Sequence, residues 1–328
     1  MATELLQDYR DEIEQALARA LAGDGPLRSA LRYHVGLEGD EPAATRSMGK
    51  LLRPSLVMFV GERFGAPRPQ LLAAATALEL VHNFSLIHDD IQDRDTLRRG
   101  RATVWSLHGW EQAINAGDLM HALAISVSLT ASPAAAARLL DATVEMIEGQ
   151  ALDLRYEQRM ATTDEYLTMV DRKTGALLRC AFDLGALLAG ESDATRAILA
   201  SLGQAVGQAF QIKDDILGIW GTDDVLGKAT GSDIRRGKKT LPIILLHERS
   251  TREDAERLAQ ALHADTPTDD QITHIVERLD DVGVRSECEA TVDAKLQHAL
   301  ELTGQLPIDE EGRAMLKQLI EYLGRRER

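Results

Sequence analysis

Apolar residues recur at three- and four-residue spacing along five long segments of the chain, which is the period of an amphipathic α-helix. The five segments are 5–21, 71–87, 134–152, 164–188 and 194–219. Several of them are apolar around most of the helix circumference, as is typical of a helix surrounded by other helices. Gly, Pro or polar clusters interrupt the period at 36–42, 65–69, 98–103, 131–133, 221–239 and 266–270. The pattern predicts an all-α fold.

Composition agrees with that prediction. The chain is rich in Ala, Leu, Glu and Gln, with 4% aromatic residues and nine prolines, a mixture that suits helices better than sheets. Its 328 residues are enough to bury a large core. No interruption resembles an interdomain linker, so we expect a single domain over 1–328.

The net charge, the apolar runs and the cysteines limit the partners and the compartments that we expect for this protein. The 37 basic and 52 acidic residues give a formal net charge of −15, which argues against binding to nucleic acid or to an anionic membrane. The N-terminus lacks the features of a signal peptide, and no apolar run reaches the ~20 residues of a membrane span, so we expect no transmembrane segment. Cys180 and Cys288 are too few and too far apart for a disulfide framework. A reducing cytoplasm fits.

Two of the five aspartate pairs lie inside apolar helical segments: Asp89-Asp90 in FSLIHDDIQD and Asp214-Asp215 in AFQIKDDILGIW. A carboxylate in a core-facing helix is costly unless a cation or hydrogen bonds compensate it. Asp89 and Asp93 are four residues apart and project from one helix face, whereas Asp90 points about 100° away. Oxygen ligands without cysteine suit Mg²⁺, which takes its remaining ligands from water and phosphates. The other pairs are Asp223-Asp224, Asp269-Asp270 and Asp280-Asp281, and we expect the last two to be solvated charges in loops or at helix ends.

Basic residues follow both aspartate pairs, and two more precede the first. A single surface Lys or Arg rarely has a function, but several beside magnesium-binding carboxylates indicate a polyanionic substrate. Leu80, Val81 and Phe84 would supply an apolar floor, so the substrate would be an amphiphilic diphosphate that ionises in a water-poor pocket. The basic residues are Lys50 and Arg53, then Arg98, Arg99 and Arg101, then Lys228, Arg235, Arg236, Lys238 and Lys239.

Six motifs make the chain resemble the trans-isoprenyl diphosphate synthases, also called polyprenyl synthetases. In order they are GKLLRP, ELVHNFSLIHDDIQD, RRG, KTG, FQIKDD and GKKTLP, and the resemblance continues to the C-terminal helices. It implies a polyprenyl synthetase domain over 1–328, with the isoprenoid-synthase helical bundle around a central active-site cavity. It also implies a homodimer, three Mg²⁺ ions, and condensation of isopentenyl diphosphate with an allylic diphosphate (dimethylallyl, geranyl or farnesyl).

The same resemblance assigns residues to roles. Loss of diphosphate would give an allylic cation, which the double bond of isopentenyl diphosphate attacks, and the product is one isoprene unit longer. The catalytic set would be Asp89, Asp90, Asp93, Lys173 and Asp214, with Asp89, Asp93 and Asp214 as metal ligands that Asp90, Asp215 and Asp233 support. The isopentenyl diphosphate site would be Lys50, Arg53, His82 and Arg99. The allylic diphosphate site would be Arg98, Lys173, Thr174, Gln211, Lys228 and Lys238.

One position departs from the pattern of the family. The second motif usually reads DDxxD, but Gly218 stands at its last position. We expect Asp214 to be the direct ligand and Asp233, in GSDIRRGKK, to supply compensating charge. The two halves of the metal site would then be unequal.

Product length should depend on side chains one to two helical turns before Asp89, about 6 to 12 Å away at 1.5 Å per residue. Phe84 and Ser85 lie there. An aromatic residue five positions before the first motif resembles the pattern of geranylgeranyl diphosphate synthases, so we expect a C20 product, with C15 farnesyl diphosphate as the alternative.

Two other activities use the same scaffold. A class I terpene cyclase would ionise an allylic diphosphate without a second substrate, and the presence of Lys50, Arg53, His82 and Arg99 argues against it. A non-catalytic partner subunit is the third interpretation: Gly218 is compatible with it, whereas the intact Asp89, Asp93 and Lys173 argue against it.

Overall fold

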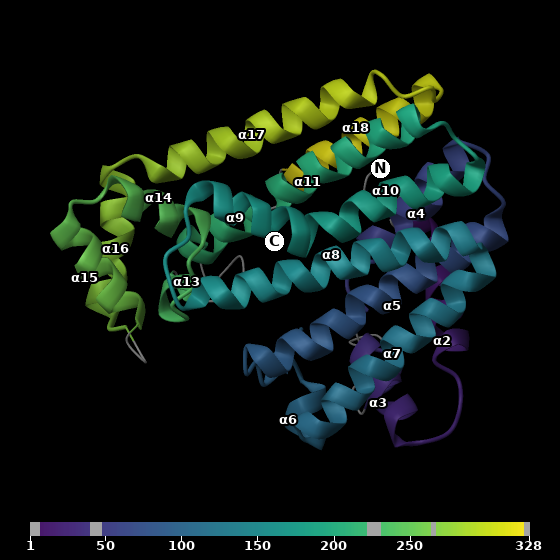
Figure 1. The fold of residues 1–328 in the computed structure, drawn as a ribbon, viewed down its shortest axis with the longest axis horizontal. Helices are drawn as coiled ribbons and strands as arrows, with labels where there is room; N and C mark the ends of the chain where they lie inside the picture. The colour runs from purple at the N-terminus through teal and green to yellow at the C-terminus, as the bar shows by residue number, and fades with distance from the viewer. Residues whose placement is uncertain (1–6, 40–47, 222–230, 264–266, 325–328) are drawn as a thin grey trace. The chain divides into compact units, whose positions relative to one another are not determined.

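The computed structural model describes residues 7–39, 48–221, 231–263 and 267–324, and its regular elements there are helices apart from one short hairpin (Figure 1). In the first half of the chain these are α2 (Arg10–Ala20), α3 (Pro26–Val35), α4 (Leu52–Arg63), α5 (Arg68–Gln92), β1 (Leu97–Arg98), β2 (Arg101–Ala102), α6 (Val104–His108), α7 (Trp110–Ala131) and α8 (Pro133–Glu157). In the second half they are α9 (Thr163–Val170), the π-helical turn η2 (Asp171–Gly175), α10 (Ala176–Ala189), α11 (Asp193–Trp220), α13 (Ser232–Arg235), α14 (Leu241–Arg249), α15 (Arg252–His263), α16 (Asp269–Asp281), α17 (Val284–Thr303) and α18 (Glu310–Gly324).

The chain divides into two compact units. The first consists of Met1–Thr143, Cys180–Leu199 and Pro307–Asp309, and the second of Val144–Arg179, Ala200–Leu306 and Glu310–Arg328. Helices α8, α10 and α11 therefore each contribute residues to both units.

Helix α5 forms the core of the first unit. It packs along α7 and also contacts α2, α3, α4 and α6 (Figure 1). Gly61 lets α4 pack closely against α5, because a Cβ atom at this position would collide with the Leu71 side chain of α5. Arg68–Gln92 is long and apolar enough to cross a membrane, but 67% of its apolar window is buried inside the protein, as in a core helix.

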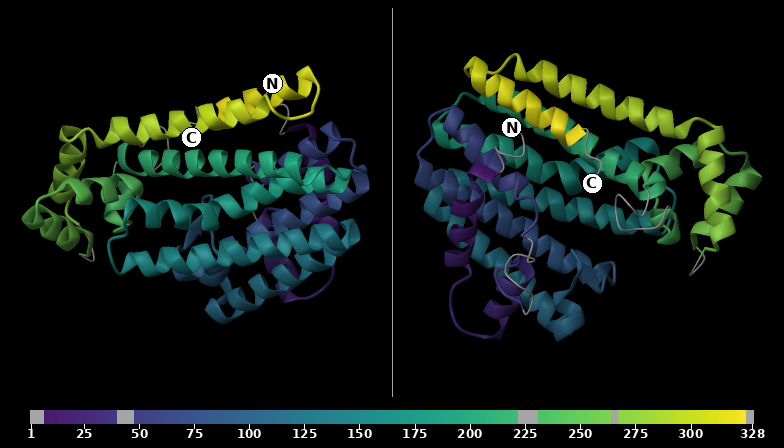
Figure 2. Two further views of the ribbon diagram at one scale, coloured as in Figure 1. Left: turned by 45° about the horizontal axis from the view of Figure 1, so that its top comes forward. Right: turned by 180° about the vertical axis from the view of Figure 1, so that it is seen from behind.

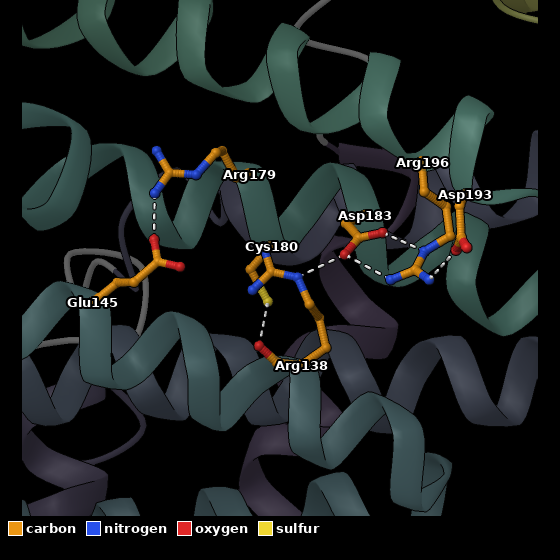
Figure 3. A network of polar contacts seen from close by, with 7 residues as sticks. All are labelled: Arg138, Glu145, Arg179, Cys180, Asp183, Asp193 and Arg196. Carbon is orange, nitrogen blue, oxygen red and sulfur yellow. Dashed lines mark hydrogen bonds and ion pairs between the residues drawn. The ribbon is translucent and has the colours of Figure 1, made fainter.

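A buried ion triad links three helical segments of the first unit. Asp183 is only 4% exposed, and both of its carboxylate oxygens accept hydrogen bonds from arginines (Figure 3). Arg138 Nε donates to Oδ2 at 2.6 Å, while Arg196 Nε and Nη2 donate to Oδ1 and Oδ2 at 2.7 and 3.1 Å. Cys180, in the same region, is fully buried. The two guanidinium groups compensate the cost of burying this carboxylate.

The second unit has its own apolar core, built from α9, the later part of α11, α14, α16 and α17. Helices α17 and α18 lie side by side (Figures 1 and 2). Capping boxes begin two of the helices: Thr162 with Glu165 at α9, and Thr268 with Gln271 at α16. In each box a side-chain oxygen satisfies a backbone N–H group that the helix leaves without an internal partner.

The structure confirms the all-α prediction and most of the predicted boundaries. Segments 71–87, 134–152 and 194–219 fall within α5, α8 and α11. Segment 164–188 is interrupted by η2, and the break at 98–103 contains the hairpin β1–β2. Asp269-Asp270 and Asp280-Asp281 lie at the two ends of α16, as expected for solvated charges, whereas Asp223-Asp224 lies outside the described residues.

Candidate active site

The first aspartate motif lies at the C-terminal end of α5, in the first unit. Asp93 caps this helix, and its N–H donates to the Asp89 carbonyl at 2.8 Å. The chain then turns sharply, because Arg94 adopts a left-handed conformation with a φ of 55°. The N–H of Arg94 bonds to Ile91 O and that of Asp95 to Asp90 O, at 3.3 and 3.0 Å, which is the bonding pattern of a Schellman motif. Asp89 and Asp93 therefore project together from the last turn.

Carboxylates are concentrated at this end of α5. A helix C-terminus carries partial negative charge, which favours basic residues there. The last turn of α5 contains none, yet it carries the half-buried Asp89 and the exposed Asp93. The local field therefore favours a cation beside these two carboxylates.

Asp90 occupies a different environment from its neighbours. It is 1% exposed, and Arg98 Nε donates to its Oδ1 at 2.7 Å. Its Oδ2 is buried and has no hydrogen-bond partner among the described residues. Burial raises its pKa to about 6, although the charge of Arg98 opposes that shift. As expected from its position on the helix, Asp90 points away from the face of Asp89 and Asp93, and it holds Arg98 in place.

Four basic groups of the predicted isopentenyl diphosphate site gather in the first unit. Arg53 Nη1 lies 3.2 Å from His82 Nε2. Burial lowers the pKa of His82 well below its usual value, and the charges of Arg53 and Arg99 lower it further, so the imidazole is neutral. The guanidinium of Arg99 lies against Gly49, where a Cβ atom would come within 2.7 Å of its Nη2, and Lys50 is the next residue.

Arg99 lies in the loop of the β1–β2 hairpin, where its backbone adopts a strained conformation. Arg99 and Gly100 form the two-residue loop of the β1–β2 hairpin, and both have positive φ, 52° and 76°. This loop type favours glycine at such positions, and a non-glycine residue held there is often part of a functional site.

Phe84 and Ser85 lie on α5 before the first motif, as their spacing predicted. Phe84 is buried, and its ring makes an edge contact with His88 at 5.8 Å and a tilted contact with His121 of α7 at 4.8 Å between ring centroids. Ser85 donates to its own helix, at His82 O, at 2.7 Å. Gly117 admits the His88 ring, since a Cβ atom at that position would collide with it. Phe84 is therefore braced from two sides.

The second aspartate motif lies on α11, in the second unit. Asp214 is half-buried, whereas Asp215 is 4% exposed. Asp215 accepts hydrogen bonds from Tyr166 Oη at 2.5 Å, Gln211 Nε2 at 3.0 Å and the backbone N–H of Leu241 at 3.0 Å. Burial raises its pKa to about 7 despite these bonds. Asp215 thus connects α9, α11 and α14 through its hydrogen bonds.

The carboxylate of Asp233 lies against Gly218. A Cβ atom at position 218 would overlap Asp233 Oδ2 and would lie 3.2 Å from its Oδ1. Asp233 is half-buried on the short helix α13. It therefore fills the space in which the last aspartate of the usual motif would begin.

The turn η2 presents Lys173 and Thr174. Gly149 of α8 lets the two segments approach, because a Cβ atom there would collide with the Lys173 backbone, and Asp153, one helical turn later, pairs with Lys173 Nζ. Thr174 Oγ1 donates to Gln211 Oε1 at 2.9 Å. The structure thus brings these two predicted site residues together with Asp215.

Asp171 anchors this turn. Its Oδ2 accepts from Gln204 Nε2 at 2.6 Å, and its Oδ1 accepts from Gln208 Nε2 at 2.7 Å. Arg179 Nη1 also donates to the Asp171 carbonyl at 2.9 Å. A π-helical turn inside a helix often marks a functional position, and here three side chains hold it.

The basic residues after the second motif are only partly described. Lys238 is exposed, and its backbone N–H bonds to Asp233 O at 2.9 Å. Lys239 Nζ donates to Glu157 O. Lys228 lies outside the described residues.

The donor atoms fit magnesium better than a transition metal. Across the described residues, no three His, Cys, Asp or Glu side chains converge on a single point. Carboxylates that supply only one or two ligands each suit an ion that keeps waters and binds phosphate oxygens. Asp89 and Asp93 of the first unit provide two such carboxylates on the last turn of one helix.

Three residues of the site escaped the sequence analysis. Tyr166 and Asp171 lie within the helical segment 164–188, and Asp153 directly follows the segment 134–152, so none of the three belongs to a motif. Each acts through a partner on another helix, and helical spacing carries no signal for such contacts.

Comparison with known proteins gives a consistent result. A family model described as polyprenyl synthetase matches residues 42–279. The chain is 37% identical over 309 residues to a (2E,6E)-farnesyl diphosphate synthase of Mycobacterium tuberculosis, covering 92% of this chain and 86% of the relative. It is 40% identical over 269 residues to a geranylgeranyl diphosphate synthase of the same organism, covering 79% and 76%. A polyprenyl synthetase structure from Streptomyces coelicolor A3(2) matches with a TM-score of 0.87 and 34% identity, covering 98% and 99% of the two chains.

Proposed function

Because the chain belongs to the polyprenyl synthetase family and is a prenyltransferase, we propose that it condenses isopentenyl diphosphate with an allylic diphosphate to give geranylgeranyl diphosphate. It is a short-chain trans-prenyl diphosphate synthase. The two substrates are those of the family, and the C20 product rests on this chain's own residues.

The observation that carries the proposal is the pair Asp89 and Asp93 at the negative end of α5. With Asp214 they would hold magnesium, whose chemistry there is to neutralise charge on a departing diphosphate. Asp90 and Asp215 support their neighbours from buried positions, and Asp233 adds negative charge beside Asp214's helix.

The basic residues form two groups, and each group binds one of the two diphosphates. Lys50, Arg53, His82 and Arg99 bind isopentenyl diphosphate, and the neutral imidazole of His82 donates a hydrogen bond without adding charge. Arg98, Lys173, Lys228 and Lys238 bind the allylic diphosphate. Thr174 and Gln211 turn side-chain oxygens toward the allylic cation and stabilise it.

Phe84 limits the product to C20. A braced aromatic ring below the first motif is a firm floor, because His88 and His121 restrict its rotamers. Ser85, beside it, is small. The relatives include both a farnesyl and a geranylgeranyl diphosphate synthase, so C15 is the alternative product.

The deciding experiment incubates the purified protein with Mg²⁺, isopentenyl diphosphate and each allylic primer in turn, and identifies the products by mass spectrometry. A product that stops at C20 supports the proposal. A product that stops at C15 means that the enzyme makes farnesyl diphosphate instead of geranylgeranyl diphosphate. A cyclised hydrocarbon formed without isopentenyl diphosphate indicates a class I terpene cyclase. No product from any primer indicates a non-catalytic partner subunit.

The working form is a homodimer in which residues 1–328 act as one polyprenyl synthetase domain. Leu140, Val144 and Ile147 lie along one face of α8 and are 37%, 56% and 48% exposed. Large exposed apolar side chains grouped in this way mark an association surface. Light scattering of the parent and of Val144→Asp tests the dimer, which the charge should dissociate.

The cytoplasm is the proposed location. Both cysteines of the chain are reduced and buried, as is common in a reducing compartment. Fractionation of cells that produce the tagged protein tests this assignment.

A further inference from the structure

A cavity lies in the second unit, lined by none of the predicted active-site residues. It has a volume of about 350 Å³, within the range of small-molecule sites. It lies among α14, α15 and α16, three neighbouring helices of the second unit that are labelled in Figure 1. Its lining is Leu246 and Ser250 at the end of α14, Asp254, Arg257, Leu258, Gln260 and Ala261 on α15, and Gln271, His274, Ile275 and Arg278 on α16.

The cavity arises from two helical stripes. Asp254, Arg257, Leu258 and Ala261 follow the i, i+3, i+4, i+7 spacing of one helix face, and Gln271, His274, Ile275 and Arg278 repeat it on α16. Such stripes normally interdigitate when helices pack together. Here both meet α14, and a hollow remains at the positions they share.

The apolar members of the lining form its buried part. Leu246, Leu258 and Ile275 are 5%, 6% and 5% exposed, and Ala261 is 9% exposed. Ala261 is the smallest of the lining side chains, so it leaves room where a larger one would close the hollow. An aliphatic or ring-shaped body of modest size fits this part.

The polar members include one arginine that is not compensated by an acidic side chain. Arg278 is half-buried, and no carboxylate in the described part of the chain pairs with it. Arg257 Nη2 bonds to the exposed Glu253 on its own helix at 2.5 Å, and its Nη1 lies 3.9 Å from Asp254 Oδ1. Asp254 also accepts a hydrogen bond from Thr251 Oγ1 at 3.0 Å. Arg278 is therefore the guanidinium group of the lining that no carboxylate of the described residues compensates.

We propose that this cavity, the α15–α16 pocket, binds a small organic phosphate with a short apolar body. Guanidinium groups complement phosphate through paired hydrogen bonds, and the body would replace water over Leu246, Leu258 and Ile275. Arg278 provides the main charge contact, Arg257 and His274 the remaining donors. The pocket stands apart from the proposed prenyl transfer and does not depend on it.

Titration calorimetry of the full-length protein with octyl phosphate tests the proposal. Mg²⁺ and inorganic diphosphate are added in excess to occupy the candidate active site. The decisive variant is Arg278→Gln, and its matched control is Arg252→Gln, an exposed arginine of α15 that pairs with Glu256 and does not line the pocket. Ala261→Phe fills the apolar part.

The parent and Arg252→Gln should bind equally. Arg278→Gln should bind at least about tenfold more weakly, the equivalent of one lost charged hydrogen bond, and Ala261→Phe should not bind. Octanol and inorganic phosphate should each bind more weakly than octyl phosphate. Absence of binding to the parent overturns the proposal, as does equal affinity of Arg278→Gln and Arg252→Gln. Because Arg278 makes no ion pair here, its variant should fold normally, and circular dichroism checks this.

Discussion

The carboxylate of Asp233 occupies the space that a side chain at Gly218 would need. The two residues come from different helices, α13 and α11. The chain has therefore exchanged a carboxylate on one helix for a carboxylate that reaches the same place from another. If Asp233 supplies the charge that the last acid of the usual motif would carry, the two positions should depend on each other.

The exchange predicts a reciprocal dependence between the two positions. Gly218→Asp alone should collide with Asp233 and weaken binding of inorganic diphosphate in the presence of Mg²⁺ by at least about tenfold, or 1.4 kcal/mol. Asp233→Gly alone should also weaken it, and the double variant should recover most of the loss. Calorimetric titration with Mg²⁺ and diphosphate measures this, with Asp270→Gly as an exposed control. Additive losses in the double variant would show that the two positions act independently.

The metal assignment of Asp214 has a separate test. Asp214→Ala should lose activity at ordinary Mg²⁺ concentration and need more Mg²⁺ for what remains, because it removes a direct ligand. Asp233→Ala should raise the Mg²⁺ concentration needed for activity by less than Asp214→Ala does. A Mg²⁺ titration of the steady-state rate compares them, and unchanged activity in Asp214→Ala would exclude it as a ligand.

Asp171 should act as a positioning residue. Asp171→Ala removes both acceptors that hold Gln204 and Gln208, so Lys173 and Thr174 should lose their alignment and kcat should fall about 10- to 100-fold. Asp171→Asn retains one acceptor and should recover part of the rate. Steady-state kinetics on the allylic diphosphate gives kcat and KM separately. Asp164→Ala, an exposed acid of α9, is the control, and equal kcat in it and Asp171→Ala would contradict the assignment.

The Asp183 triad should matter for stability. Asp183→Ala leaves two arginines facing each other without a carboxylate, and removing one partner of a buried ion pair costs about 3–5 kcal/mol. Asp193→Ala, which removes an exposed partner of Arg196, should cost less than about 1 kcal/mol. Urea unfolding measures both. Similar values for the two variants would mean that the triad is replaceable.

Phe84→Ala should lengthen the product. Removing the ring opens the space that His88 and His121 now brace, so chains beyond the parent product should accumulate. Chromatography of the dephosphorylated alcohols measures the distribution. Phe182→Leu, a change at another buried ring of the first unit, should leave the product unchanged. A Phe84→Ala variant that is active and yields no longer chains would remove Phe84 from the floor.

The sequence predicted helices well and contacts between them poorly. The shared face of Asp89 and Asp93, and the different direction of Asp90, followed from helical geometry alone and are present in the structure. The meeting of Tyr166 with Asp215, or of Asp233 with Gly218, depends on how separate helices pack, and periodicity holds no record of that. The left-handed conformation of Arg94 was also invisible, because a glycine would be the expected signal at that position.

The burial of Cys180 and Cys288 has a practical consequence. Both thiols are fully covered, and burial raises the pKa of Cys288 to about 12, so neither should react with an alkylating reagent while the protein is folded. The extent of reaction with such a reagent would instead measure the fraction of molecules that have unfolded enough to expose a thiol. A single cysteine placed on the surface would be the one site to take up a spectroscopic probe, so motion of the α15–α16 pocket or of the hairpin could be followed without first removing a native thiol.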